Sequence, residues 1–350
     1  MKLLKQLSEM PGAPGREEHV RRFIREQVTE HVDEMETDAM GNLICRRHAD
    51  DSAPAPQKVM LACHMDEIAF YVRNIDEKGF IRVQPLGGFD VRNLFARRVR
   101  VETRGGDEIF GNFNPGGRPI HIAKEEDKEK IPEIKEFFVD TGLPADEVRE
   151  RVRPGDPVTL VQTFEQMGEL ASGKSLDNRV ACWLGIRTLE ALSDVALQDH
   201  LIVAFTVQEE IGLRGATTSS FDVDPDIGIA IDVTLAVDTP GVPDEEQITD
   251  LGDGVAIKVM DGHSVSDKRL VDEFVDIAER QEIPHQMEIL PMGGTDAGAL
   301  QRARSGSRAI TLSVPTRYIH TVTETIHRGD LHAGLDLLTA YLTRYELITS

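Results

Sequence analysis

The chain has 350 residues, of which 40% are hydrophobic, and its formal net charge at pH 7 is −22. These values describe a globular protein with room for one large domain or two smaller ones. They exclude nucleic acid and anionic membrane surfaces as main partners, because the electrostatic force would be repulsive. The sequence contains no apolar run of about 18 residues, so we expect no membrane span, and its first residues carry no signal-peptide pattern. The three cysteines are widely spaced, which favours a reducing, cytoplasmic location over a disulfide framework.

The first part of the chain predicts two helices followed by strands. We expect helices over 1–9 and 16–28, separated by the turn sequence "PGAPG". In the second helix, apolar residues recur at the spacing of one helical face. The runs "GNLICRR" and "KVMLACHMDEIAFYV" predict strands on either side of a polar loop over 48–57.

The pattern of predicted secondary structure changes between about residues 69 and 161. Short β-like runs ("AFYVRNI", "FIRVQPL", "RVRVET" and "PVTLVQT") alternate there with Gly, Asp and Asn turns. One charged segment over 125–138 predicts a helical insertion. This spacing of strands is typical of a small β-barrel or sandwich.

Helices and strands alternate again after Ser172. We expect helices over 178–192, 268–281 and 332–348 and strands over 200–208, 226–233, 254–262 and 307–315. This is α/β patterning. The sequence therefore predicts a discontinuous α/β domain over 1–67 and 163–350, interrupted by an inserted β domain over 68–162.

Histidines and carboxylates follow several of the predicted strands or precede a helix. They are His64 and Asp66 in "CHMDE", Asp177 in "SLDNR", Glu209 and Glu210 in "VQEE", Asp232 in "AIDVT" and His320 in "YIHT". Each has an ordinary explanation when taken alone, such as a helix N-cap or a turn residue. Functional groups in α/β sheets collect at the carboxyl ends of the strands, so we expect these residues to meet there.

Two histidines with several carboxylates favour a site for two divalent ions. Imidazole and carboxylate ligands suit zinc or cobalt, with manganese as a third candidate. The adjacent glutamates would repel each other unless positive charge lay beside them. One of them can bind metal while the other acts as a general base. Asp66, two residues after His64, can accept the other ring N–H of that histidine and orient it.

In combination and in order, the motifs resemble those of the M42 family of metallo-aminopeptidases, which includes TET-like and glutamyl aminopeptidases and proteins labelled cellulase M. The resemblance covers nearly the whole chain, from "MPGAPGREE" through "CHMDEIAF", "PLGGFDVRNL", "SLDNR", "VQEEIGLRGA", "AIDVT" and "MGGTDAGA" to "IHT". It implies a phosphopeptidase-like zinc-peptidase α/β catalytic domain with an inserted small β-barrel domain used in dimerisation. It also implies a homo-oligomer built from dimers, often a hollow dodecamer, that acts on peptide substrates.

The same resemblance implies a role for each site residue. One metal ion would be held by His64, Asp177 and Asp232, and a second by Asp177, Glu210 and His320, so that Asp177 bridges them. Glu209 would be the general base and acid, with Asp66 orienting His64. In "GGTDAG", Thr295 and Asp296 are candidates for positioning the substrate, and a structural turn explains them equally well.

Two other activities remain open at this stage. An N-deacylase or a carboxypeptidase-type amidohydrolase would use the same metal chemistry on different substrates, and a requirement for a free amine would separate these activities from an aminopeptidase. An endoglucanase would need two carboxyls flanking a sugar bond. Because the carboxylates here are assigned to metals, the sequence favours an aminopeptidase over an endoglucanase.

Overall fold

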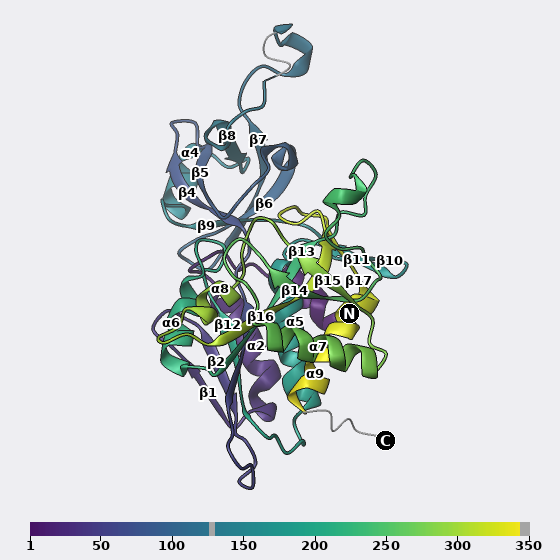
Figure 1. The fold of residues 1–350 in the computed structure, drawn as a ribbon. Coiled ribbons are helices and arrows are strands. Elements are labelled where there is room, and N and C mark those ends of the chain that lie inside the picture. The colour runs from purple at the N-terminus through teal and green to yellow at the C-terminus, as the bar shows by residue number, and fades with distance from the viewer. Residues whose placement is uncertain (126–129, 344–350) are drawn as a thin grey trace.

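The computed structural model describes residues 1–125 and 130–343, and it consists of a large mixed sheet with helices on both faces and a closed barrel at one end (Figure 1). The helices are α1 (Lys2–Glu9), α2 (Glu18–Val28), α4 (Ala145–Arg151), α5 (Leu176–Ala191), α6 (Arg214–Val223), α7 (Lys268–Arg280), α8 (Ala297–Gln301) and α9 (Arg328–Leu342). Short 3-10 turns are η1 (Thr29–His31), η2 (Val91–Leu94), η3 (Ile120–Ile122), η4 (Ile134–Glu136) and η5 (Asp244–Glu246).

The strands of the large sheet are β1 (Glu34–Thr37), β2 (Leu43–Arg47), β3 (Lys58–His64), β10 (Glu165–Met167), β11 (Leu170–Gly173), β12 (His200–Thr206), β13 (Ile227–Leu235), β14 (Val255–Met260), β15 (His285–Ile289), β16 (Arg308–Arg317) and β17 (Glu324–His327). Their order is β1-β2-β12-β3-β13-β16-β17-β11-β10, and β14 pairs with both β15 and β16. The four central strands β12, β3, β13 and β16 are parallel. The carboxyl ends of these four strands therefore lie side by side at the same end of the sheet.

Helices cover the sheet on both sides, which explains why its central strands read as continuous apolar runs. In β12, Val203 and Phe205 pack into a core shared with α1, α2, α5, α7 and α9. The alternate residues Ile202 and Ala204 pack on the other face, against α6 and α8. The period-two alternation of strand side chains thus feeds two separate cores from one strand.

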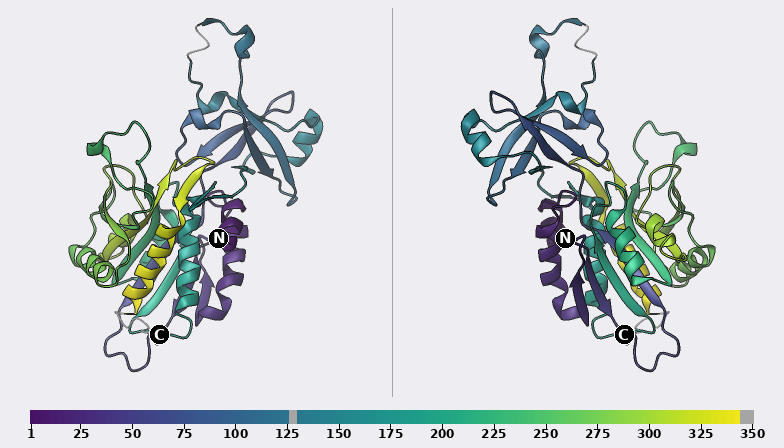
Figure 2. Two further views of the ribbon diagram at one scale, coloured as in Figure 1. Left: turned by 90° about the vertical axis from the view of Figure 1, so that its right-hand side faces the viewer. Right: turned by 90° about the vertical axis from the view of Figure 1, so that its left-hand side faces the viewer.

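The barrel is closed by six strands in the order β4-β5-β8-β7-β6-β9. They are β4 (Ala69–Ile75), β5 (Ile81–Leu86), β6 (Arg97–Glu102), β7 (Glu108–Pro115), β8 (Phe137–Asp140) and β9 (Pro157–Leu160). Phe70, Phe113 and Phe137 pack in its core with ring centroids about 5 Å apart. Since β4 follows β3 after four residues, the barrel sits beside the carboxyl ends of the central strands, as both views in Figure 2 show.

The predicted α/β architecture with an inserted small barrel is confirmed. The barrel strands run from Ala69 to Leu160, and the exact division at 68–162 stays a prediction. The predicted strand over 58–72 is wrong in its middle, because β3 ends at His64 and the chain turns before Ala69. No helix in the described part of the chain is long and apolar enough to span a membrane.

The helical insertion predicted over 125–138 is wrong over 130–138. Glu125 is helical and residues 126–129 lie outside the described part of the chain, whereas residues 130–136 form only η4 before β8 begins at Phe137. Phe137 and Val139 are fully buried in the barrel core, so their alternation overrides the helical pattern of the charged residues before them. The last predicted helix ends at Leu342, and residues 344–350 are not described.

Candidate metal centre

Six of the predicted site residues come together at the carboxyl edge of the central strands. His64 ends β3, Asp232 lies on β13, and Glu209 and Glu210 follow β12. Asp177 lies in the first turn of α5, and His320 lies in the loop between β16 and β17. Their ligand atoms form two groups, each within 4.8 Å, namely His64 with Glu209 and Asp232, and Asp177 with Glu210 and His320.

Asp177 joins the two groups. One of its oxygens, Oδ1, lies 3.3 Å from Nε2 of His64, while Oδ2 lies 3.3 Å from Nε2 of His320. Glu210 approaches the same ring nitrogen of His320, with Oε2 also 3.3 Å from Nε2. A carboxylate that reaches a different histidine with each oxygen has the geometry expected of a bridging ligand.

The donor set fits divalent ions. Imidazole nitrogens and carboxylate oxygens are ligands of zinc and related metals. Within this set, Oε1 of Glu210 is buried and has no hydrogen-bond partner among the described residues. A buried, unpaired carboxylate oxygen is costly unless a cation meets it.

Asp66 holds the loop that carries both glutamates. It is fully buried, and its two carboxylate oxygens accept hydrogen bonds from the backbone N–H groups of Glu209 (3.0 Å) and Glu210 (3.1 Å). Nδ1 of His64 lies 3.5 Å from Oδ1 of Asp66 and 3.2 Å from its backbone oxygen. The residue expected to orient His64 thus also fixes the glutamate turn.

Glu324 plays the corresponding part on the other side of the site, and nothing in the sequence analysis pointed to it. This residue is 2% exposed, and its carboxylate accepts hydrogen bonds from the backbone N–H groups of Asp177 (2.9 Å) and His320 (2.8 Å). Its partners are separated by more than 140 residues in sequence, so no local motif reveals the contact. A glutamate at the start of β17 within four residues of a candidate ligand is the one weak signal available.

The barrel also reaches the site through the turn after β5. Gly87 has a left-handed φ of 90°, and a Cβ there would lie 2.6 Å from the side chain of Ile68 and 3.3 Å from Oε2 of Glu210. A Cβ on Gly88 would lie 3.5 Å from the imidazole of His320. The glycine pair therefore lets the turn pass close to the ligands.

Left-handed backbone at residues other than glycine gathers around the same site. Ser175, Gln208 and His320 have φ values between 56° and 63°. Each is either a candidate ligand or lies within two residues of one. Such conformations cost energy and persist where the surrounding structure holds them, which is common at functional sites.

The site buries several carboxylates close together, and this burial and their mutual repulsion shift the pKa values of its residues. Burial raises the pKa of Glu209 and Asp232 well above the ordinary value, and the neighbouring carboxylates raise it further. Burial alone would lower the pKa of His64, but Glu209, Asp177 and other acids around it raise it instead. The carboxyl of Asp177 is the exception, because the two histidines outweigh burial and lower its pKa. Bound divalent cations would stabilise the ionised carboxylates in place of the protons and protonated histidines.

Thr295 and Asp296, the predicted substrate-positioning residues, occupy different places. Thr295 lines the cavity over the two groups, although its hydroxyl already bonds to that of Thr311 at 2.8 Å. Asp296 is buried, with Oδ2 accepting a hydrogen bond from Thr206 at 2.6 Å, and Oδ1 finds no partner in the part of the chain that the structure describes. Their role toward substrate stays a prediction.

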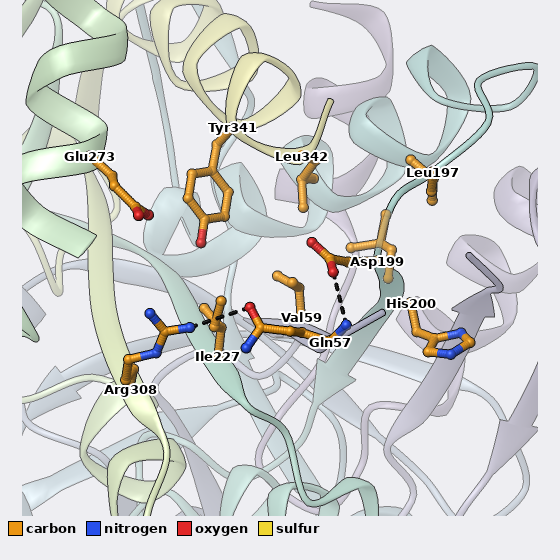
Figure 3. A pocket seen from close by; sticks show the side chains of 11 residues that line it. Gln57, Val59, Leu197, Asp199, His200, Ile227, Glu273, Arg308, Tyr341 and Leu342 are labelled. Atoms are coloured by element: carbon orange, nitrogen blue, oxygen red, sulfur yellow. Dashed lines mark hydrogen bonds between the residues drawn. The ribbon is translucent and has the colours of Figure 1, made fainter. Parts of the chain in front are cut away.

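A second cavity, of about 410 Å³, lies at the opposite ends of the same strands (Figure 3). Val59, His200 and Ile227, at the starts of β3, β12 and β13, line it. Its polar side includes Gln57, whose backbone N–H bonds to Asp199 at 2.8 Å. Within residues 1–125 and 130–343, both groups of potential metal ligands lie at the other end of the sheet. This second cavity is therefore separate from the two groups of candidate metal ligands.

Comparison with known proteins gives a consistent match. Residues 41–337 match the M42 glutamyl aminopeptidase family. A lysyl aminopeptidase of Pyrococcus furiosus is 33% identical, with 97% of this chain and 96% of that protein covered. A glutamyl aminopeptidase of Lactococcus lactis is 30% identical, with 97% and 95% covered.

Solved structures agree with these relatives. An aminopeptidase from the archaeon Desulfurococcus kamchatkensis superposes with a TM-score of 0.92 at 34% identity, covering 100% of this chain and 97% of that one. The TET1 peptidase of Pyrococcus horikoshii, which can assemble into a tetrahedron or a large octahedral shell, gives 0.87 at 30% identity, with 99% of both chains covered. A Thermotoga maritima protein described as an endoglucanase gives 0.79 at 30% identity, with 97% of this chain and 96% of that one covered.

Proposed function

The chain belongs to the M42 glutamyl aminopeptidase family and is an aminopeptidase, and from this premise we propose that it hydrolyses the first peptide bond of its substrates with two divalent metal ions and with Glu209 as general base. The observation that carries the proposal is the position of Asp177. Its two oxygens lie 3.3 Å from two different histidines, one in each ligand group.

In this proposal, His64, Asp177 and Asp232 hold one ion, and Asp177, Glu210 and His320 hold the other. Zinc or cobalt suits this mixture of imidazole and carboxylate, and manganese is a third candidate. Such ions, when bound, lower the pKa of water and polarise a scissile carbonyl.

Glu209 is left as the proton carrier. Its Oε2 lies 3.8 Å from Nε2 of His64, the same distance as Oδ1 of Asp232, so the choice between these two carboxylates rests on the family resemblance and not on distance. With Asp177 and Asp232 as carboxylate ligands, the Glu209 carboxylate is free to accept a proton from the attacking water. It then donates that proton to the departing amine nitrogen. Asp66 fixes the backbone of Glu209 and so keeps the carboxylate in place.

Two other activities on this scaffold are less well supported. A deacylase or carboxypeptidase-type activity would need no free N-terminal amine, and no contact described here favours it. An endoglucanase would need carboxyls placed for a sugar bond, whereas three of the four clustered carboxylates are assigned in this proposal to metal ions and the fourth, Glu209, to the attacking water.

We also propose that the protein is a cytoplasmic homo-oligomer with a dimer as building block and the barrel in the dimer contact. The TET1 peptidase of Pyrococcus horikoshii can assemble into a tetrahedron or a large octahedral shell, and the three cysteines of this chain are buried and unpaired. The phosphopeptidase-like nature of the α/β part belongs to the same proposal.

The test is a reconstitution assay with paired peptides. The enzyme is stripped with a chelator, reloaded with zinc or cobalt, and given short peptides that carry either a free or an N-acetylated first residue. We expect metal-dependent release of the first residue from the free peptides alone. Cleavage of the acetylated peptides would transfer the function to a deacylase, and activity in the stripped enzyme would overturn the metal mechanism.

A further inference from the structure

The cavity over the two ligand groups has a volume of about 450 Å³, and most of its lining outside those groups is apolar. Leu235 follows Asp232 by three residues, and Leu290 and Met292 come from the segment after β15. Leu213, three residues after Glu210, and Ile319, directly before His320, line the cavity as well. If a peptide binds at the ligand groups, the side chain closest to them would therefore contact these apolar residues.

The charged lining residues outside the two groups offer no free charge. Lys258 lines the cavity, but its side chain is fully buried and its Nζ lies 3.0 Å from Oε1 of Glu288 and 3.7 Å from Oδ2 of Asp261. Oε1 of Glu288 also accepts a hydrogen bond from the Thr234 hydroxyl at 2.5 Å. Nζ makes no hydrogen bond of good geometry within the described part of the chain, but the two carboxylates beside it balance its charge.

His263 is the other ionisable lining residue among those described. It packs against Gly294, where a Cβ would come within 2.1 Å of its Nδ1. It is exposed at the rim, and its backbone N–H bonds to Asp261. Outside the two ligand groups, the described part of the chain therefore gives this cavity no carboxylate and no ammonium group that lacks an oppositely charged neighbour.

We propose that this cavity receives the side chain of the N-terminal residue and selects uncharged, apolar side chains, such as those of Leu, Met and Phe, over Lys, Arg, Asp and Glu. The proposal rests on the proposed aminopeptidase function. An apolar side chain gains by leaving water, whereas a charged one loses its hydration and finds no partner. This selectivity would set the chain apart from relatives named lysyl and glutamyl aminopeptidases.

Leu235 is the residue through which the selectivity can be changed. It ends β13 and is 39% exposed, so a charged side chain can stand there without being buried in the core. Leu235→Glu would supply the missing partner for a basic N-terminal residue, and Leu235→Lys would supply the partner for an acidic one.

The experiment measures kcat/KM of the metal-loaded enzyme for dipeptides X-Ala with Leu, Met, Phe, Ala, Lys or Glu as X. We expect kcat/KM for Leu to exceed that for Lys and for Glu by at least about tenfold. Leu235→Glu should raise the Lys-to-Leu ratio at least about tenfold, and Leu235→Lys should raise the Glu-to-Leu ratio similarly. Met167→Glu and Met167→Lys, at a 51% exposed position on β10 that does not line the cavity, are the matched controls and should leave both ratios unchanged.

The outcomes separate the two proposals. A wild-type preference for Lys or Glu would overturn the apolar selectivity while leaving the aminopeptidase function intact. If none of the free dipeptides were cleaved while their acetylated forms were, the proposed function itself would fail. Leu235 variants that lose activity without a change in ratio would exclude Leu235 as the determinant, and the wild-type panel would still decide the selectivity.

Discussion

The two ligand groups contain similar residues but are built by different parts of the molecule. His64 lies at the end of a central strand and is 2% exposed, with Asp66 behind its ring. His320 lies in a loop with left-handed backbone, and its side chain is 33% exposed. We call the group of His64, Glu209 and Asp232 the closed group and the group of Asp177, Glu210 and His320 the open group.

This difference predicts that the two groups bind metal with unequal affinity. Ligands fixed by a sheet lose little freedom when they bind an ion, whereas a loop histidine must be ordered by its own supports. Those supports are Glu324 and the close-packed turn at Gly87 and Gly88. We therefore expect the open group to bind its ion more weakly and to exchange it faster.

The largest effect should come from removing the link between the groups. Asp177→Ala takes away the carboxylate that reaches both histidines, so both ions should be lost and kcat/KM should fall by about 10⁴-fold or more. Metal content per subunit, measured by mass spectrometry together with turnover, checks this. A variant that still holds two ions would refute the bridge.

The next effect should come from Glu209 and should leave both groups filled. Glu209→Gln keeps the size of the side chain but cannot take up a proton, so kcat should fall by about 10²- to 10⁴-fold. Metal content should remain that of the wild type. Near-normal kcat would exclude Glu209 as the base, and loss of one ion would make it a ligand of the closed group, where it lies 3.8 Å from His64.

Glu324 should distinguish the open from the closed group. Its carboxylate bonds to the backbone of Asp177 and His320 and to no member of the closed group. Glu324→Gln replaces one acceptor oxygen by an N–H₂ group that faces a backbone donor. We expect the affinity of the open group, which loses support for both Asp177 and His320, to fall about 10- to 100-fold, and the affinity of the other ion, which shares only Asp177, to fall less.

Metal titration of the stripped protein measures both affinities directly. Thr323→Ser, at the exposed neighbouring position, is the control and should change neither. Equal weakening of the two groups would mean that Glu324 supports the fold in general rather than the open group.

The parts of this site that the sequence predicts are those built by strands. The buried runs before His64, Glu209 and Asp232 have the composition of central parallel strands, and such strands place their ends together. Residue types and the order of the motifs then point to metal chemistry. Local composition therefore carries the identity of these ligands and their approximate meeting place.

The supports of the ligands could not be predicted in this way. Glu324 contacts the backbone of Asp177 across 147 residues, and a hydrogen bond to a backbone N–H leaves no pattern in sequence. The loop contacts of Gly88 with His320 depend on how the barrel docks onto the sheet. The segment over 125–138 shows the same limit, because the barrel core decides that Phe137 begins a strand.

The smallest effect on turnover should come from Glu17, which supports the loop shared by both groups. This carboxylate is 2% exposed and accepts hydrogen bonds from the backbone N–H groups of Gly15 (2.7 Å) and Gln208 (3.2 Å). Burial, followed by repulsion from Asp66, raises the pKa of Glu17 to about 8. Because that pKa lies above the ordinary value of the unfolded chain, the folded state binds the proton more tightly.

The stability that Glu17 contributes is therefore fully present below about pH 4.5 and is lost as the pH rises through about 8. Glu17→Gln should remove this loss. Between pH 5 and 9, the free energy of unfolding of the metal-loaded variant should therefore fall by on the order of 3 kcal/mol less than that of the wild type. Urea unfolding across this pH range measures the slope, and Glu18→Gln at the exposed neighbouring position is the control. If Glu17→Gln and the wild type kept parallel profiles, Glu17 would be ionised in the folded protein, and the glutamate loop would be held by a carboxylate rather than by a carboxylic acid.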